Sequence, residues 1–209
     1  AMFHSSSLVM SLLTGVSGLV YEVAWQRWLA TLGIASVAPD SFALPGRVTY
    51  TSPISKEQYE RIHAMRLAEI TPALKAVASQ PWADTSKLVL AGASEGGVPV
   101  ARYAGNEFAA RMIFAWSCEP NYFVTEPKNA LPQDRPVLNL ISASDPFFSS
   151  ANTWLGHAIA KGHCGDALKD NKYSTVTLIP GAPHTLLNVP QARAVTAGFL
   201  REALKTEAR

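Results

Sequence analysis

Short apolar runs rich in β-branched residues alternate with longer segments of helical character along most of the chain. The apolar runs predict strands at residues 8–13, 34–38, 87–91, 112–116, 136–142 and 173–179. The longer segments predict helices at residues 21–32, 55–79, 95–104, 150–161 and 190–205. Strands that alternate with helices favour an α/β fold with a mostly parallel, doubly wound sheet flanked by helices.

The longest predicted helix, residues 55–79, carries two local signals. Ser55 and Gln58 have the spacing of a capping box, in which two side chains bond the free backbone N–H groups at a helix start. Pro72 lacks a backbone N–H and is expected to kink the helix near Thr71. The sequence therefore predicts one bent helix that begins at Ser55.

The composition is that of an ordinary globular protein. The chain has 209 residues, of which 48% are hydrophobic and 16% are charged, which is enough for one large core. No repeat or low-complexity linker divides it, so residues 1–209 are predicted to form a single domain, with 1–7 as a tag remnant or an irregular N-terminus. The net charge of +2 and the lack of a basic run give no support for nucleic acid or an acidic membrane as a partner.

The apolar stretch at residues 8–20 has the character of a signal-peptide core, but no Lys or Arg precedes it and no clear cleavage site follows. It is shorter than the roughly 18 apolar residues that a spanning helix needs. Serines, a threonine and glycines interrupt it further. We therefore expect a strand of the sheet here and no membrane partner.

The pentapeptide GASEG at residues 92–96 is the strongest candidate for chemistry. It follows the apolar run 87–91 and precedes a helix-compatible stretch, the context in which a serine at a sharp strand-to-helix turn projects its hydroxyl outward. The small residues around Ser94 keep Cβ atoms away from that turn. The alternative is a glycine-rich turn that merely packs a helix close to the sheet.

A serine hydroxyl is a weak nucleophile unless a base takes its proton and a third group orients the base. His184 is the predicted base, because it follows the strand-like segment 173–179 and the turn 180–183 and so lies on a loop at a strand's carboxyl end. Surface or core positions are expected for the remaining histidines, which lie in or next to helices or near the terminus: His4, His63, His157 and His163.

Asp145 is the predicted acid that orients the base. It comes just after the buried strand 136–142, so it is expected at the same edge of the sheet as Ser94 and His184. An Asp before Pro often caps a turn, and that is the alternative for Asp145. Three other carboxylates are weaker candidates: Glu119, Asp134 and Asp166.

With these residues in place, the chain resembles the α/β-hydrolase superfamily and, within it, the dienelactone hydrolase-like group. Ser94, Asp145 and His184 follow the chain order of that superfamily. The similarity extends from about Leu8 to the end and includes WQRW at 25–28, PDSF at 39–42, QPWAD at 80–84, SASD at 142–145 and GAPH at 181–184. It implies the α/β-hydrolase fold, with the N-terminal strands reduced because little sequence precedes the first predicted strand.

Two positions depart from the pattern of the group. The founding dienelactone hydrolases have a cysteine nucleophile, so Ser94 favours a serine esterase over dienelactone hydrolysis. Thr14 stands where a histidine is usual in the oxyanion-hole loop, but Gly15 still permits close backbone approach. The resemblance therefore implies an oxyanion hole formed by the backbone amides of Val16 and Glu95. The side chain of Glu95 is expected to face solvent or a polar group of the substrate.

Aromatic side chains near the predicted strand ends are candidates to line an apolar pocket for an acyl or aromatic group. They are Trp116, Tyr122, Phe147 and Phe148. The alternative is core packing, which is common for bulky residues at strand ends.

The two cysteines, Cys118 and Cys164, follow a predicted strand and a predicted helix near the same edge of the sheet. A disulfide between them would indicate a periplasmic or secreted protein. Two reduced thiols are the alternative, and they would favour a cytoplasmic protein. No Cys/His spacing typical of a metal site is present.

Taken together, these residues predict a serine hydrolase that cleaves small-molecule carboxylic esters through a Ser-His-Asp triad and an acyl-enzyme intermediate. No metal and no cofactor are expected, and a homodimer is left open. An acyltransferase or thioesterase with the same triad is the first alternative, because pocket shape chooses the acceptor. A non-catalytic binding protein on the same scaffold is the second, because fold alone does not guarantee activity.

Overall fold

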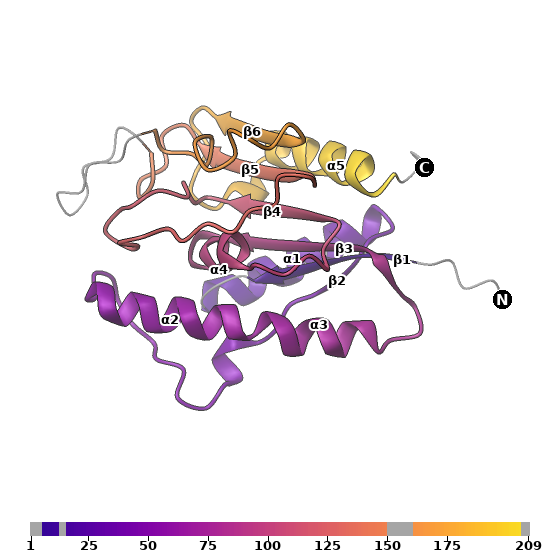
Figure 1. The fold of residues 1–209 in the computed structure, drawn as a ribbon, viewed down its shortest axis with the longest axis horizontal. Coiled ribbons are helices and arrows are strands. Elements are labelled where there is room, and N and C mark those ends of the chain that lie inside the picture. The colour runs from indigo at the N-terminus through magenta and orange to yellow at the C-terminus, as the bar shows by residue number, and fades with distance from the viewer. Residues whose placement is uncertain (1–5, 13–15, 150–160, 206–209) are drawn as a thin grey trace.

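A parallel sheet forms the centre of the molecule (Figure 1), with the strand order β2-β1-β3-β4-β5-β6 among the described residues. The structure is a computed structural model that describes residues 6–12, 16–149 and 161–205, with the backbone alone for 6–12 and 16–23. The strands are β1 (Ser6–Leu12), β2 (Ala35–Val37), β3 (Ala83–Ala93), β4 (Ala110–Phe114), β5 (Val137–Ser142) and β6 (Ser174–Ile179). The α-helices are α1 (Val16–Thr31), α2 (Lys56–Ala68), α3 (Ile70–Ala78), α4 (Gly97–Arg102) and α5 (Pro190–Leu204). Short 3₁₀ helices are η1 (Ser41–Ala43), η2 (Ser94–Gly96) and η4 (Leu186–Asn188).

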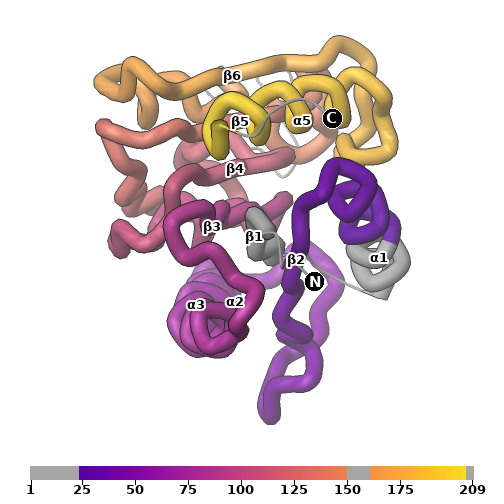
Figure 2. Tube along the Cα trace, turned by 90° about the vertical axis from the view of Figure 1, so that its right-hand side faces the viewer, coloured from indigo at the N-terminus to yellow at the C-terminus, as the bar shows by residue number. Residues whose placement is uncertain are grey.

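Helices cover both faces of the sheet. Figure 2 shows α1 and α5 on one side and α2 and α3 on the other. Along β3, Leu88 and Leu90 pack into the core under α2, α3 and α4, while Val89 and Ala91 pack into the core under α1 and α5. A strand buried on both faces reads as a continuous apolar run, which is how the sequence identified it. The predicted α/β class with a parallel sheet is confirmed.

The predicted strands are present with shifted ends. β1 begins at Ser6, so residues 6 and 7 belong to the sheet and not to an irregular N-terminus. β4 ends at Phe114, two residues before the predicted end, because Ala115 turns the chain with a φ of 49°. The predicted helix at 150–161 lies outside the described residues except for its last position.

The segment predicted as one bent helix is two helices. The capping box at its start is present, with Ser55 and Gln58 each accepting the other's backbone N–H. The break is at Glu69 and not near Thr71. Pro72 cannot donate to the carbonyl of Ala68 and its ring crowds that group, so α2 ends at Ala68 and a new helix starts at Ile70.

All of the strand pairs are parallel, so the strands end at a common edge. The segments after β2, β3, β5 and β6 therefore meet at that edge, which is where crevices form in sheets of this kind. Within the described ranges, no helix has both the length and the apolar character needed to cross a bilayer.

Candidate active site

Ser94 lies at the turn from β3 into η2 and has a φ of 53°, in the left-handed region that side chains other than glycine rarely adopt. The turn leaves no room for larger neighbours, since a Cβ on Gly92 would lie 2.0 Å from the carbonyl oxygen of Gly96. Ser94 itself is half-buried. The strand–turn–helix context predicted for this serine is therefore present, with a strained backbone at Ser94 that the close packing holds in place.

Asp145 and His184 are in direct contact at the same edge. Oδ2 of Asp145 lies 2.7 Å from Nδ1 of His184. The other carboxylate oxygen, Oδ1, accepts the backbone N–H groups of Phe147 and Phe148 at 2.9 and 3.0 Å. Asp145 is fully buried, whereas the side chain of His184 is 21% exposed. The carboxylate thus does both things that the sequence offered as alternatives: it caps the turn and it orients the imidazole.

A proton on Nδ1 of His184 satisfies this contact and leaves Nε2 with a free lone pair. Between Ser94 and His184, both within the described part of the chain, no hydrogen bond is formed. The structure therefore joins Asp145 to His184 and brings Ser94 to the same edge without closing the last contact.

The aromatic residues predicted to line a pocket divide into two groups. The ring of Phe147 packs edge-on against the ring of His184, with centroids 4.8 Å apart, and is half-buried. Phe148 lies 5.9 Å from the same ring and stacks on Tyr122, and both are buried. Trp116 is completely enclosed in the core. Core packing, the alternative given for these residues, describes Trp116, Tyr122 and Phe148, while Phe147 borders the imidazole.

The rival histidines have other surroundings. Nε2 of the buried His63 bonds the carbonyl of Phe123 at 3.2 Å, and burial lowers its pKa to about 4. Nδ1 of His163 accepts the backbone N–H of Gly165. His4 and His157 lie outside the described residues.

The rival carboxylates are also engaged elsewhere. Glu119 is buried and accepts the backbone N–H groups of Lys161 and Gly162 at 3.0 and 2.9 Å. Asp134 and Asp166 are exposed and pair with Arg135 and Lys161, respectively. Within the described ranges, no three side chains of His, Cys, Asp or Glu gather to hold a metal ion.

The predicted oxyanion-hole residues lie at two helix starts. Val16 is the first residue of α1, directly after β1 and the residues 13–15, which include Thr14 and Gly15 and lie outside the described part. Glu95 is the second residue of η2. Their backbone amides belong to elements that begin at the carboxyl edge of the sheet.

The expectation for the side chain of Glu95 is wrong. Its carboxylate is buried, and it accepts hydrogen bonds from Arg47 at 2.8 Å and from the hydroxyl of Tyr50 at 2.5 Å. A buried carboxylate needs such partners because losing its hydration is costly. The sequence held one signal of this, a lone acid among small residues at a tight turn, but nothing that identified the two partners.

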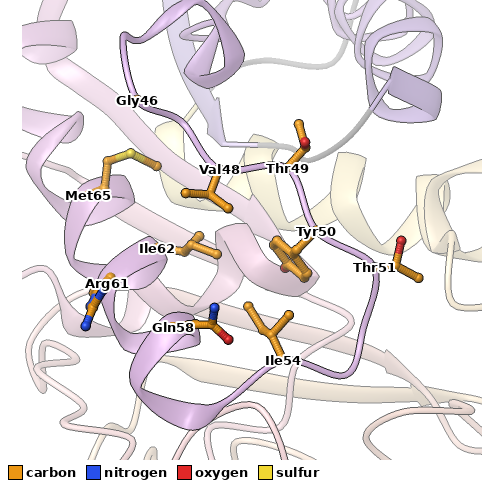
Figure 3. A pocket seen from close by; sticks show the side chains of 10 residues that line it. All are labelled: Gly46, Val48, Thr49, Tyr50, Thr51, Ile54, Gln58, Arg61, Ile62 and Met65. Carbon is orange, nitrogen blue, oxygen red and sulfur yellow. The ribbon is translucent and has the colours of Figure 1, made fainter.

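A cavity of about 460 Å³ lies between residues 46–54 and α2 (Figure 3). Val48, Tyr50 and Ile62 point toward one another there, and Gln58 adds a polar group. None of the four predicted pocket residues lines it. Tyr50 links the cavity to the candidate site, because it lines the cavity and its hydroxyl bonds the carboxylate of Glu95.

Cys118 and Cys164 form a disulfide, with Cα atoms 4.8 Å apart. The bridge joins the segment after β4 to the segment that follows residues 150–160. Glu119 reinforces the same junction through the amides of Lys161 and Gly162. Of the two states left open by the sequence, the oxidised one is present.

Several solved structures of known proteins are similar to the structure of this chain. Neither a family model nor a curated protein sequence matches it. A cold-adapted esterase from an Arctic intertidal metagenomic library has a TM-score of 0.66 and 18% identity over 96% of this chain and 84% of its own. A candidate dienelactone hydrolase from Klebsiella pneumoniae has a TM-score of 0.65 and 17% identity over 97% and 88%. Est1E from Butyrivibrio proteoclasticus has a TM-score of 0.60 and 16% identity over 96% and 88%. With its parallel sheet, its helices on both faces and these structural neighbours, the chain has the α/β-hydrolase fold.

Proposed function

We propose that this chain is a serine hydrolase that cleaves carboxylic esters of small molecules, built as one α/β-hydrolase domain over residues 1–209. The observation that carries the proposal is the 2.7 Å contact between Asp145 and His184 at the edge of the sheet where Ser94 lies in the turn after β3. The proposal is also supported by the similarity in fold to proteins described as esterases.

In the first half of the reaction, Oγ of Ser94 attacks the ester carbonyl carbon while Nε2 of His184 takes the hydroxyl proton. His184 must approach Ser94 for this step, and catalytic hydrogen bonds of this kind often tighten only when substrate binds. The tetrahedral intermediate collapses as the imidazolium returns the proton to the leaving alcohol. The products are the free alcohol and an acyl ester on Ser94.

In the second half, water attacks the carbonyl carbon of the acyl ester while His184 takes a proton from the water. His184 then returns this proton to Oγ of Ser94 as the carboxylic acid is released. Asp145 holds the imidazole in the tautomer that leaves Nε2 free and stabilises the imidazolium when it forms. The amides of Glu95 and Val16 are proposed to bind the oxyanion, and the loss of one such donor costs about 3 kcal/mol of transition-state stabilisation.

The test combines a fluorophosphonate probe with short-chain p-nitrophenyl esters. The wild type should be labelled and should hydrolyse the esters, and Ser94→Ala should lose both. Ser86→Ala is a matched control, because it removes an exposed hydroxyl from the other end of β3, where it bonds Asp84. Labelling of Ser94→Ala at the rate of the wild type would refute the assignment of the nucleophile.

The same experiment separates the other functions. Labelling without ester turnover would indicate an acyltransferase, or a thioesterase with a narrow substrate range. No labelling of the folded wild type would indicate a binding protein on the same scaffold and would overturn the proposal.

We also propose that the protein works in an oxidising compartment, either periplasmic or extracellular. Disulfides such as Cys118–Cys164 persist there and are rare where thiols are kept reduced. Protein isolated without added reductant should show no titratable thiol in denaturant, and two titratable thiols would contradict this.

A further inference from the structure

The carboxylate of Glu95 joins three parts of the molecule. Nη2 of Arg47 and the hydroxyl of Tyr50 donate to its two oxygens at 2.8 and 2.5 Å, and both come from the loop between β2 and α2. Nε of Arg66, in α2, lies 3.8 Å from Oε1. Arg66 also lies 3.8 Å from Glu69. Two arginines and two glutamates thus form a neutral group with little exposure to solvent, next to Ser94.

The loop that supplies Arg47 and Tyr50 packs on the core only in part, through Tyr50 and Ile54. The cavity of about 460 Å³ is lined by residues of the loop on one side and by residues of α2 on the other (Figure 3). Phe42 and Val48 of the same loop are 39% and 59% exposed. A small number of polar contacts therefore hold the loop to the body, among them the bonds of Arg47 and Tyr50 to Glu95 and the buried bond from Ser41 to Glu69.

The backbone of Glu95 belongs to the turn that holds Ser94. Glu95 follows Ser94 directly in η2, and Ser94 is held at a φ of 53°. Such a conformation persists when its surroundings restrain it from several directions. The amide of Glu95 is also a proposed oxyanion donor, so a shift of this residue would move both the nucleophile and the hole. A displacement of about 1 Å in a reacting group can cost on the order of a hundredfold in rate.

We propose that Glu95 is a positioning residue whose carboxylate, anchored by Arg47 and Tyr50, fixes the place of Oγ of Ser94 and of the Glu95 amide. This inference rests on the proposed function of Ser94. It assigns to the loop between β2 and α2 a role in the rate of the reaction, although neither Arg47 nor Tyr50 takes part in the chemistry.

The test compares two hydroxyl deletions in the same aromatic cluster. Tyr50→Phe removes the bond to Glu95 and keeps the ring, which packs against Tyr59 with centroids 5.6 Å apart. Tyr59→Phe is the matched control: its hydroxyl bonds Ser52 and the amide of Ile54, and so also ties down the loop, but it does not touch Glu95. Both variants are first checked for full folding at the assay temperature.

The expected result is a split between the two kinetic constants. In Tyr50→Phe, kcat and the fluorophosphonate labelling rate should fall about tenfold while KM changes less than about twofold, because the geometry of the nucleophile is lost and substrate binding is kept. Tyr59→Phe should stay within about twofold of the wild type in both constants. Glu95→Gln, which keeps the shape but loses the charge, should lower kcat at least as much as Tyr50→Phe.

A second readout does not depend on activity. Hydrogen exchange at the amides of residues 95–97 should be faster in Tyr50→Phe than in Tyr59→Phe. If the wild type reacts with the probe but the two variants react and exchange alike, the positioning role is overturned and the proposed function stands. If the folded wild type does not react, the proposed function fails, and the role in catalysis assigned to Glu95 fails with it.

Discussion

Asp145 shows how one side chain satisfies two demands with two oxygen atoms. Oδ1 holds the turn by accepting the amides of Phe147 and Phe148, and Oδ2 contacts His184. Because the turn is held by the same group that orients the imidazole, the position of His184 depends on a carboxylate that cannot move independently. The two oxygens can be tested separately, because asparagine keeps one side-chain oxygen and has an NH₂ group in place of the other.

Asp145→Asn should lower kcat by about 10³–10⁴-fold and leave the fold intact. The Asn oxygen can still accept the amides of Phe147 and Phe148, but its NH₂ group faces Nδ1 of His184 and favours the wrong imidazole tautomer. Ester hydrolysis and thermal unfolding of the variant are the measurements. Asp134→Asn, at an exposed carboxylate, is the control and should leave both unchanged. A large loss of stability in Asp145→Asn would show that the turn needs the charge.

Gly92 is required for a steric reason at the same turn. An added Cβ would lie 2.0 Å from the backbone oxygen of Gly96, so Gly92→Ala should destabilise the fold by at least about 2 kcal/mol. Gly198→Ala, in the exposed face of α5 with nothing within 4 Å, is the control. It should stabilise the protein by about 0.5–1 kcal/mol, because alanine loses less backbone entropy in a helix. Urea unfolding compares the two, and equal stabilities would refute this account of Gly92.

Among the helices, α2 has an unusual polar core face. Arg66 and His63 are both fully buried, and the ring of His63 packs edge-on against Phe123 with centroids 4.5 Å apart. Its neutral form is favoured because burial penalises the charge, which lowers its pKa to about 4. At the end of α4 a second buried donor is present: the guanidinium of Arg111, from β4, donates to the carbonyls of Val100 and Tyr103. The buried donor of Arg111 thus joins α4 to the sheet, and that of His63 joins α2 to the segment after β4.

The titration of His63 predicts a loss of stability in acid. The unfolded chain takes up this proton near the ordinary pKa of 6.5 and the folded chain only near 4. Between these values the unfolded state binds more protons, so the free energy of unfolding falls as the pH is lowered. The contribution of His63 between about pH 7.5 and about pH 4.5 is roughly 2–3 kcal/mol.

Urea unfolding at the two pH values should show this loss in the wild type. His63→Gln keeps a donor for the carbonyl of Phe123 without the titration and should be less sensitive to acid by that amount. His163→Gln, at a partly exposed histidine, is the control and should retain the pH dependence of the wild type. An unchanged pH dependence in His63→Gln would refute the buried neutral imidazole.

The molecule as a unit is closed by one long-range cross-link. The Cys118–Cys164 bridge spans 46 residues and connects the segment after β4 with the segment before β6. Cys164 is tied to the sheet as well, through its amide to Oδ1 of the buried Asn139. A disulfide stabilises a protein mainly by restricting the unfolded chain, and the effect is larger when the closed loop is longer.

Removing the bridge should lower the free energy of unfolding by about 4 kcal/mol, the loop-entropy value for a closed loop of this length. Urea unfolding of Cys118→Ser/Cys164→Ser against the oxidised wild type is the measurement. Reductant should destabilise the wild type to a similar degree and leave the double variant unchanged. A double variant as stable as the oxidised wild type would contradict the prediction.

Local patterns predicted much of this architecture. Apolar runs placed the strands, and the capping-box residues Ser55 and Gln58 placed the start of α2. Parallel strands end at one edge, so the positions of Asp145 and His184 after two strands predicted their proximity. Whether Ser94 completes a catalytic triad with them stays a prediction. Signals of this kind are readable because they depend on residues a few positions apart.

Other features depend on how distant segments fold over one another. The amino-acid order contains Arg47, Tyr50 and Glu95, but their meeting depends on the path of a loop 45 or more residues away from the turn. The same holds for the enclosure of Trp116 and for the cavity beside α2. Periodicity reports whether a side chain faces a core, not which partner it finds there. A carboxylate needs buried partners only when the tertiary packing removes the water around it. The partners of Glu95 therefore follow from the tertiary structure.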